Sequence, residues 1–457
     1  MKGRMFLFAI AVLYVTGNLT ADCLSYHIDP HAIALSSAVA AAIGISLIGT
    51  MPKASLLSVF CTGCLGASIY NMNVCSLHDS SMQDGEECMV EGIVADKGLS
   101  SSGRPWIEVI LPDSRTIIYN IPTRICCLPG DTVSAYVKVS KVRNFSPDFD
   151  YVRHMARRKV LYTCLCLDRK RQAECRPCED VPLSLIPARL RHNFSKKIDI
   201  MFRDDSSAGT AAVVKALAYG YQDEIPKTVK ESFRNSGAIH LLALSGMHLG
   251  LIYAFLHRLM ALLTGNSPAA RRVRSILILC ALWSYTIFTG SGVSILRAAV
   301  TFTIYEAGIL AGRKKDGLSA MSASAVIITT ADPSSPSSIS FQLTYAAMTA
   351  IFLIYPYLRS AISPGWKPAR LLTDACAMTI ACQVTTAPVI LLHFGTFAFF
   401  SLIANLLCSP LVSAAMILIP VSLLCSGIDG HIFRIPSLIL EAIIGIFIDI
   451  NKIISSL

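Results

Sequence analysis

The sequence predicts an all-α multi-pass membrane bundle of about eleven transmembrane helices, with a small β-barrel domain inserted near its start. Of the 457 residues, 53% are hydrophobic and only 15% are charged, and the mean hydropathy is +0.55. A soluble chain carries about 25% charged residues. The composition therefore excludes an ordinary soluble enzyme, a disordered regulator and a soluble basic protein of the nucleic-acid-binding kind.

The charges gather in one stretch, which divides the chain. Residues 72–235 hold 24 of the 40 Lys and Arg residues and 21 of the 30 Asp and Glu residues. We expect four regions: about three transmembrane helices in 1–71, an extracytoplasmic OB-like barrel in 72–150, a soluble or interfacial connector in 151–236, and a transmembrane channel domain in 237–457.

The membrane spans follow from the apolar runs, since a spanning helix needs about 20 mostly apolar residues. The predicted spans are 5–21, 32–50, 54–71, 238–264, 275–289, 293–312, 317–331, 339–357, 371–394, 397–425 and 435–453. Lys and Arg then concentrate in alternate short loops, for example Arg271, Arg272 and Arg313, as the positive-inside rule requires of cytoplasmic loops. This pattern predicts a cytoplasmic N-terminus and an extracytoplasmic 72–235 segment.

The insert begins with short β-branched runs separated by Gly and Pro turns. The predicted strands are 88–95, 105–111, 115–121 and 132–142. Four or five short strands indicate a small barrel of the OB kind. Some such barrels stack bases on aromatic side chains, for which Trp106, Tyr119 and Tyr136 are available. The alternative is that these rings pack the barrel or its surface.

Basic clusters and cysteines follow the predicted barrel. Arg157, Arg158 and Lys159 are candidate DNA-binding residues, since cations bind a polyanion, but a solvated helical face is the alternative. The insert has eight cysteines, and Cys164-x-Cys166 with Cys175-x-x-Cys178 has a zinc-like arrangement. Because this spacing is irregular, we expect disulfides or free thiols. No metal site and no cofactor is predicted.

Polar residues inside the apolar block are the most informative feature. An ionisable group within a membrane usually faces the bundle interior or a wet cavity. The segment 237–250 contains His240, Ser245, Gly246 and His248. On one helix, Ser245 and His248 would share a face, and His240 would lie within about 80° of His248. Gly246 and Gly250 would let another helix approach closely.

The later spans carry further polar groups. Arg297 either extends toward the interface or contributes positive potential to a cavity. Gln342, Gln383 and Asn405 place amides inside three spans, and Pro410 interrupts the last of these. Each amide alone is consistent with interhelical contact, but together they favour a polar pathway.

These motifs resemble the ComEC-type competence family of inner-membrane proteins that pass single-stranded transforming DNA into the cytoplasm. The resemblance rests on GAIHLLALSGMHLG (237–250), GSGVSILRAAV (290–300), SFQLTYAA (340–347), CQVTTAPVILLHFG (382–395) and LIANLLCSP (402–410). It implies that the channel is shaped by the motif residues His240, Ser245, Gly246, His248, Arg297, Gln342, Gln383, Asn405 and Pro410.

One departure from the family pattern concerns the metallo-β-lactamase-like domain that many members carry. The chain ends just after its last apolar span, and its ten histidines nowhere form His-x-His-x-Asp. We therefore expect a variant without this hydrolase domain, with no catalysis of its own. A separate DNA receptor, nuclease and ATP-driven motor would then be its partners, besides single-stranded DNA and the lipid bilayer, and a homo-oligomer is an option.

Two other functions are compatible with the residues. Ser245 beside His248 permits an intramembrane serine hydrolase, although no third group that would orient the imidazole is evident. A transporter for a small solute or an envelope precursor is the other alternative. The leading hypothesis is an inner-membrane channel for transforming DNA in a bacterial cell.

Overall fold

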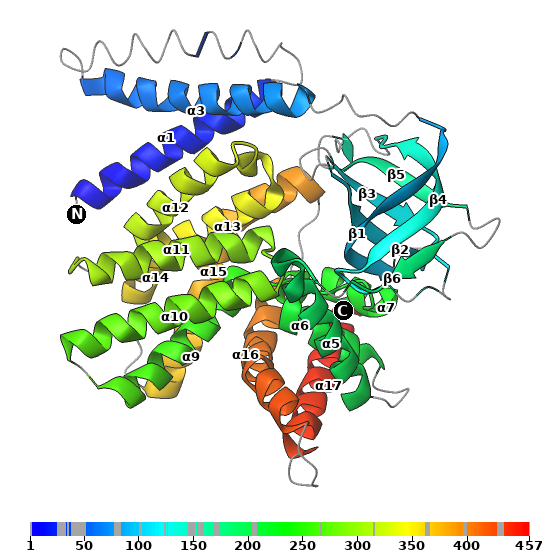
Figure 1. Cartoon of the computed structure of the whole chain (residues 1–457). Helices are drawn as coiled ribbons and strands as arrows, with labels where there is room; N and C mark the ends of the chain where they lie inside the picture. The colour runs from blue at the N-terminus through cyan, green and yellow to red at the C-terminus, as the bar shows by residue number, and fades with distance from the viewer. Residues whose placement is uncertain are drawn as a thin grey trace.

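The computed structural model describes most of the chain. The described residues are 2–24, 33, 36–37, 52–76, 84–99, 103–112, 114–122, 125, 127–144, 151–152, 155, 160–167, 173–178, 180–202, 208–265, 267–313, 316–361, 366–395, 400–426 and 434–456. A β-barrel lies beside a bundle of helices, and most of the helices run in similar directions (Figure 1).

The N-terminal helices cross in direct backbone contact. They are α1 (Lys2–Leu24) and α3 (Pro52–Ser76). A Cβ atom at Gly17 would collide with the carbonyl oxygen of Phe60, and one at Gly63 would collide with that of Tyr14. Glycine at both positions therefore permits the close crossing. The predicted span 32–50 lies almost entirely outside the described residues.

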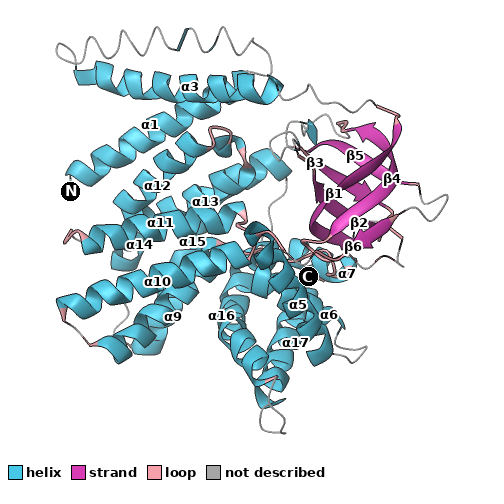
Figure 2. Ribbon diagram, viewed as in Figure 1, coloured by secondary structure: helices cyan, strands magenta, loops and turns pink. Residues whose placement is uncertain are grey.

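The insert folds into a closed five-stranded barrel with one short additional strand (Figure 2). The strands are β1 (Glu87–Leu99), β2 (Pro105–Ile110), β3 (Arg115–Tyr119), β4 (Thr132–Lys141), β5 (Val160–Cys166) and β6 (Glu174–Arg176). Their order is β1-β2-β3-β5-β4, and β1 pairs again with β4, which closes the barrel. The predicted barrel is thus confirmed, and β5, which pairs parallel to β3, comes from the segment that the sequence assigned to the connector.

The remaining chain is helical. The connector forms the 3-10 turn η1 (Leu183–Leu185), α5 (Ile186–Met201), α6 (Ala208–Tyr219) and α7 (Lys227–Asn235). The C-terminal block forms α8 (Ile239–Leu242), α9 (Gly246–Thr264), α10 (Pro268–Phe288), α11 (Val293–Leu310), α12 (Gly317–Ala331), η3 (Ser335–Ser337), α13 (Ile339–Thr349), the π-turn η4 (Ala350–Ile354), α14 (Tyr355–Ala361), α15 (Lys367–Phe394), α16 (Ser401–Cys425) and α17 (Ile435–Ser455).

Six helices in the described part of the chain are long and apolar enough to cross a membrane. They are Met5–Leu24, Gly246–Thr264, Val293–Leu310, Ile339–Ala361, Leu372–His393 and Ser401–Cys425. The predicted count of about eleven spans is not confirmed. Helices also occupy the predicted spans 54–71, 275–289, 317–331 and 435–453, but α12 is short, and α10 and α17 carry several charges.

Helix α5 connects the barrel to the bundle. Arg189 lies 4.0 Å from Asp131 of the barrel, and the Arg191 Nη1 group donates a 2.9 Å hydrogen bond to the carbonyl oxygen of Phe288 at the end of α10. Arg189 thus contacts the barrel and Arg191 contacts the bundle. The barrel therefore lies beside the helix ends where α10 stops and α11 begins.

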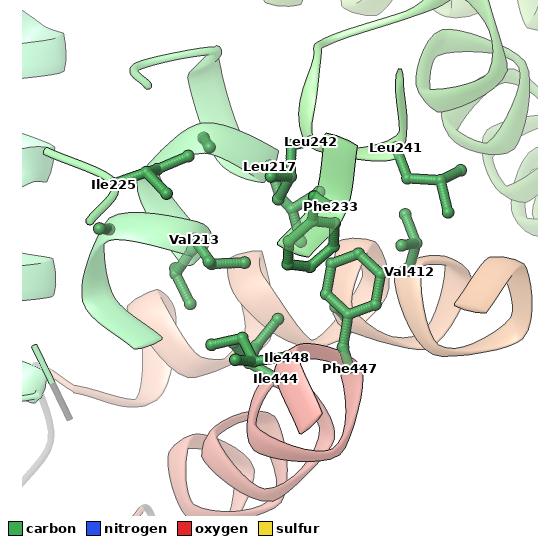
Figure 3. Close-up of a cluster of buried hydrophobic side chains, with 14 of the residues drawn as sticks. Val213, Leu217, Ile225, Phe233, Leu241, Leu242, Val412, Ile444, Phe447 and Ile448 are labelled. Atoms are coloured by element: carbon green, nitrogen blue, oxygen red, sulfur yellow. The ribbon is translucent and has the colours of Figure 1, made fainter. Parts of the chain in front are cut away.

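A large apolar cluster anchors the segment that leads into α9 (Figure 3). Phe233 of α7 and Phe447 of α17 meet edge to face, with ring centroids 4.7 Å apart. Leu241 and Leu242 of α8 and Val412 of α16 are buried in the same cluster. Removing this much apolar surface from solvent fixes α8, and with it the turn that begins α9.

Candidate functional site

The first signature segment is a helix–turn–helix rather than one continuous helix. Helix α8 ends at Leu242, Ala243 is extended with ψ 134°, and Ser245 is the N-cap of α9 with φ −127° and ψ 169°. The predicted single span 238–264 is therefore wrong in its first turns. Serine at an N-cap followed by a helical run is the ordinary signal for such a start.

Ser245 and His248 are in contact through the helix cap and not as neighbours within one continuous helix. The backbone N–H of Ser245 donates to Nδ1 of His248 at 3.1 Å, and the Ser245 Oγ lies 3.0 Å from the same nitrogen. Because a backbone N–H can only donate, Nδ1 is the acceptor, and a neutral imidazole then carries its proton on Nε2. His248 is fully buried, and its Nε2 has no hydrogen-bond partner.

His240 lies apart from this pair. It is exposed on α8, and its Nδ1 lies 3.1 Å from the carbonyl oxygen of Gly237. The prediction that His240 lies within about 80° of His248 on one helix is wrong, because the extended residues before Ser245 separate the two helices.

The sequence predicts a close helix neighbour for the glycines of α9, and in the structure that neighbour is α11. A Cβ atom on Gly246 would lie 3.4 Å from the Cβ of Ala298, and one on Gly250 would lie 3.8 Å from the ring of Phe302. The small residues therefore allow the start of α9 to pack closely against α11 at Ala298.

Arg297 is buried, with 1% of its surface exposed. It does not extend toward the interface, so that alternative is wrong. Its Nη2 lies within 3.0 Å of the hydroxyl oxygens of Ser294, Ser340 and Thr344 and of the carbonyl oxygen of Ser340. The guanidinium carbon is 6.0 Å from the ring centroid of Phe341. Arg297 therefore joins α11 to α13.

Gln342 and Gln383 each join two further helices. The Oε1 of Gln342, on α13, accepts a 2.9 Å hydrogen bond from Nε2 of His393 in α15, and its Nε2 donates to the carbonyl oxygen of Pro336 at 3.1 Å. Gln383 of α15 donates from Nε2 to the Ser401 hydroxyl of α16 at 2.8 Å. Both amides are partly exposed.

Asn405 and Pro410 lie on α16. The Oδ1 of Asn405 is buried without a hydrogen-bond partner. Pro410 stands inside the helix, where it cannot donate a backbone hydrogen bond. The hydroxyl of the preceding Ser409 donates to the carbonyl oxygen of Asn405 at 2.5 Å.

These polar residues lie on helices that contact one another in series. Contacts join α9 to α11, α11 to α13, α13 to α15, and α15 to α16. They bring Arg297 together with Ser340 and Thr344, and they leave Asn405 on a different helix pair. A common hydrated passage through all of them stays a prediction.

Two buried ionisable side chains were absent from the predicted set of functional residues. Lys215 of α6 is 1% exposed and lies 2.6 Å from Asp199 and 2.5 Å from Glu224. Glu306 of α11 is also 1% exposed, and its oxygens accept hydrogen bonds from the Tyr253 hydroxyl at 2.5 Å and the Ser275 hydroxyl at 2.6 Å. A lone lysine in the apolar run 211–219 is the signal that could have revealed the first site.

The barrel aromatics pack against the protein. Trp106 and Tyr119 are cross-strand partners, and both contact a cluster that includes Met155. This favours the packing alternative over base stacking for these two rings. The candidate DNA-binding residues Arg157, Arg158 and Lys159 lie outside the described residues.

The described barrel cysteines behave as core residues. Cys164 and Cys166 of β5 are both buried, and burial raises the pKa of the Cys164 thiol to about 11. Cys127 and Cys164 are free thiols. Among the described residues, no group of three or more His, Cys, Asp or Glu side chains is placed to hold a metal ion.

Comparison with known proteins points to one family. The family described as "Competence protein" matches residues 217–457. The chain is 29% identical over 201 residues to ComE operon protein 3 of Bacillus subtilis (strain 168), a match that covers 44% of this chain and 24% of that protein. It is 27% identical over 208 residues to the uncharacterized protein YcaI of Escherichia coli (strain K12), covering 44% of this chain and 27% of that protein.

The matched stretches thus span about a quarter of the length of these two curated relatives. No solved structure matches the chain.

Proposed function

Because the chain belongs to the competence protein family, we propose that it is a membrane channel through which a single strand of transforming DNA enters a bacterial cell. The observation that carries the proposal is that the family match, residues 217–457, is the same block that holds the polar groups within apolar helices. Polar side chains at membrane depth usually face the bundle interior or a wet cavity.

The finer features of the proposal concern topology. The protein crosses the cytoplasmic membrane about eleven times, its N-terminus is cytoplasmic, and the OB-like barrel and connector are extracytoplasmic. Segregation of Lys and Arg into alternate loops supports this orientation. A separate receptor delivers DNA, a separate nuclease degrades the other strand, and an ATP-driven motor acts from the cytoplasm.

Cysteine labelling tests the orientation. Leu183 is 86% exposed on the connector, and Arg313 is exposed in the loop after α11. In spheroplasts, Leu183→Cys should react with a membrane-impermeant maleimide, whereas Arg313→Cys should react only after the membrane is permeabilised. The reverse pattern would contradict the proposed orientation.

Gene deletion tests the function itself. Removing the gene from a transformable host should abolish internalised DNA, measured as nuclease-resistant labelled DNA, and a plasmid copy should restore it. Normal internalisation in the deletion strain would refute the proposal for that host. The same result would leave the small-solute transporter as the better hypothesis.

The serine hydrolase alternative gains no support from the geometry of Ser245 and His248. A catalytic imidazole is oriented by a third group that contacts its other nitrogen, yet no described group hydrogen-bonds to Nε2 of His248. Nδ1 instead closes the helix cap by accepting the backbone N–H of Ser245. We therefore propose a structural role for this pair and no catalytic role for the protein.

A further inference from the structure

Arg297 is a buried cation without a counter-ion. It lies in the second turn of α11, which begins at Val293, and 1% of its surface is exposed. No ion pair joins it to a carboxylate in the described part of the chain. The other charged side chain of α11, Glu306, is nine residues further on and is bonded to Tyr253 and Ser275. The charge of Arg297 is therefore uncompensated, which is unfavourable in an apolar surrounding.

The donors of Arg297 are also incompletely used. All of its hydrogen bonds are made by Nη2, which lies near four acceptor oxygens although it carries only two hydrogens. Nε and Nη1 are buried and have no hydrogen-bond partner. Because Nε carries one N–H and Nη1 carries two, three of the five guanidinium donors are unsatisfied.

The N-terminal ends of two helices add positive potential around Arg297. Helix α11 starts one turn before it, and its hydrogen bond to the Ser340 carbonyl places it against the first turn of α13. Helix N-termini carry partial positive charge and bind anions. A buried cation beside two such ends, with three donors unsatisfied, fits a site for an anion.

We infer that Arg297 binds an oxyanion, namely the phosphodiester group of a nucleic-acid strand, together with the Ser294 and Ser340 hydroxyls. This inference rests on the proposed DNA channel and assigns the part of the bundle that the strand contacts. The partly exposed Ser294 and the exposed Ser340 rotate their hydroxyls to donate to the phosphate. The buried Nε and Nη1 of Arg297 donate to it once these side chains have moved aside. Contacts of this kind do not depend on base sequence, as passage of any transforming DNA requires.

The test measures how salt affects DNA binding by the full-length protein in nanodiscs, with a fluorescent 20-nucleotide oligothymidylate as the probe. Each phosphate contact on a single strand contributes about 0.7 to the slope of log K against log salt concentration. Arg297→Gln should lower that slope by about 0.7 and weaken binding about tenfold at low salt, the size expected for a charge-assisted hydrogen bond. Arg297→Lys should keep the slope while binding more weakly than wild type.

Arg274→Gln is the matched control, because Arg274 is another buried arginine of the bundle, on α10. It should leave the slope unchanged. An unchanged slope in Arg297→Gln, or the same reduction in Arg274→Gln, would overturn the inference while the channel proposal stands. A wild-type protein that does not bind the oligothymidylate would overturn the DNA proposal, and this inference with it.

Discussion

Two of the buried cations among the described residues, Lys215 and Arg297, differ in whether an anionic side chain lies beside them. Lys215 and Arg297 are each 1% exposed, but Lys215 lies within 2.6 Å of two carboxylates, and Arg297 forms hydrogen bonds to neutral oxygens only, as far as the described residues go. A buried charge is tolerated when it is paired and hydrogen-bonded. Lys215 is therefore complete within the chain, whereas Arg297 is complete only when an anion joins it.

The largest expected effect is at Lys215. The double variant Asp199→Asn, Glu224→Gln leaves the lysine buried without its partners, and removing the partners of a buried charge costs about 3–5 kcal/mol. We expect a correspondingly large drop in the thermal unfolding temperature of the purified protein. A loss of unfolding free energy below about 1 kcal/mol, typical of exposed ion pairs, would show that the ion pairs of Lys215 contribute little to stability.

A pH effect of intermediate size is expected beside Lys215. Burial and the nearby Lys97, Lys196 and Lys215 lower the pKa of His192, on α5, to about 4, whereas a histidine in the unfolded chain titrates near pH 6.5. Between these values the unfolded state binds a proton that the folded state does not, so stability is full above about pH 6.5 and falls as the pH approaches 4.

Unfolding measured at pH 7.5 and pH 5 checks this expectation. His192→Gln should reduce the difference between the two pH values. If the variant keeps the full difference, His192 is not its source.

A smaller effect is expected at the cap of α9. Ser245→Ala removes the hydroxyl near His248 and should destabilise the protein by about 1 kcal/mol, the usual loss for an N-cap, with DNA internalisation close to that of wild type. A hydrolase that used Ser245 as its nucleophile would lose all activity. Abolished internalisation by a variant that folds and reaches the membrane normally would therefore contradict the structural role.

The smallest expected effect on stability is at Arg297, and it contrasts with the large effect expected at Lys215. Because Arg297→Gln removes an uncompensated charge, the free energy of unfolding should change by less than about 1 kcal/mol, or rise. The unfolding temperatures of the two sets of variants, measured side by side, test this contrast. A drop as large as that of the Lys215 variants would show that Arg297 stabilises the fold by itself, without a bound anion.

Local patterns in the sequence predicted part of this architecture. The first four barrel strands follow from alternating β-branched runs between turn residues, but β5 was not predicted, because its parallel pairing with β3 depends on a distant segment. The break before Ser245 was also missed, although serine before a helical run is a signal for a helix start.

The polar residues of the bundle were evident in the sequence, but their partners were not. Gln383 and Ser401 meet across two helices, and Arg297 meets Ser340 across 43 positions. Such pairs depend on how each helix is rotated and crossed, which one sequence does not specify. That Nε and Nη1 of Arg297 lack partners follows only from the packed structure.

Cross-linking from the residue beside Arg297 tests the central claim most directly. Phe341→4-azidophenylalanine nearly preserves the shape of the ring that lies 6.0 Å from the guanidinium, and Phe255→4-azidophenylalanine places the same group on an exposed face of α9. With labelled DNA arrested during uptake, we predict a protein–DNA adduct after illumination at position 341 and none at position 255. DNA that cross-links at 255 but not at 341 would contradict a strand path past Arg297.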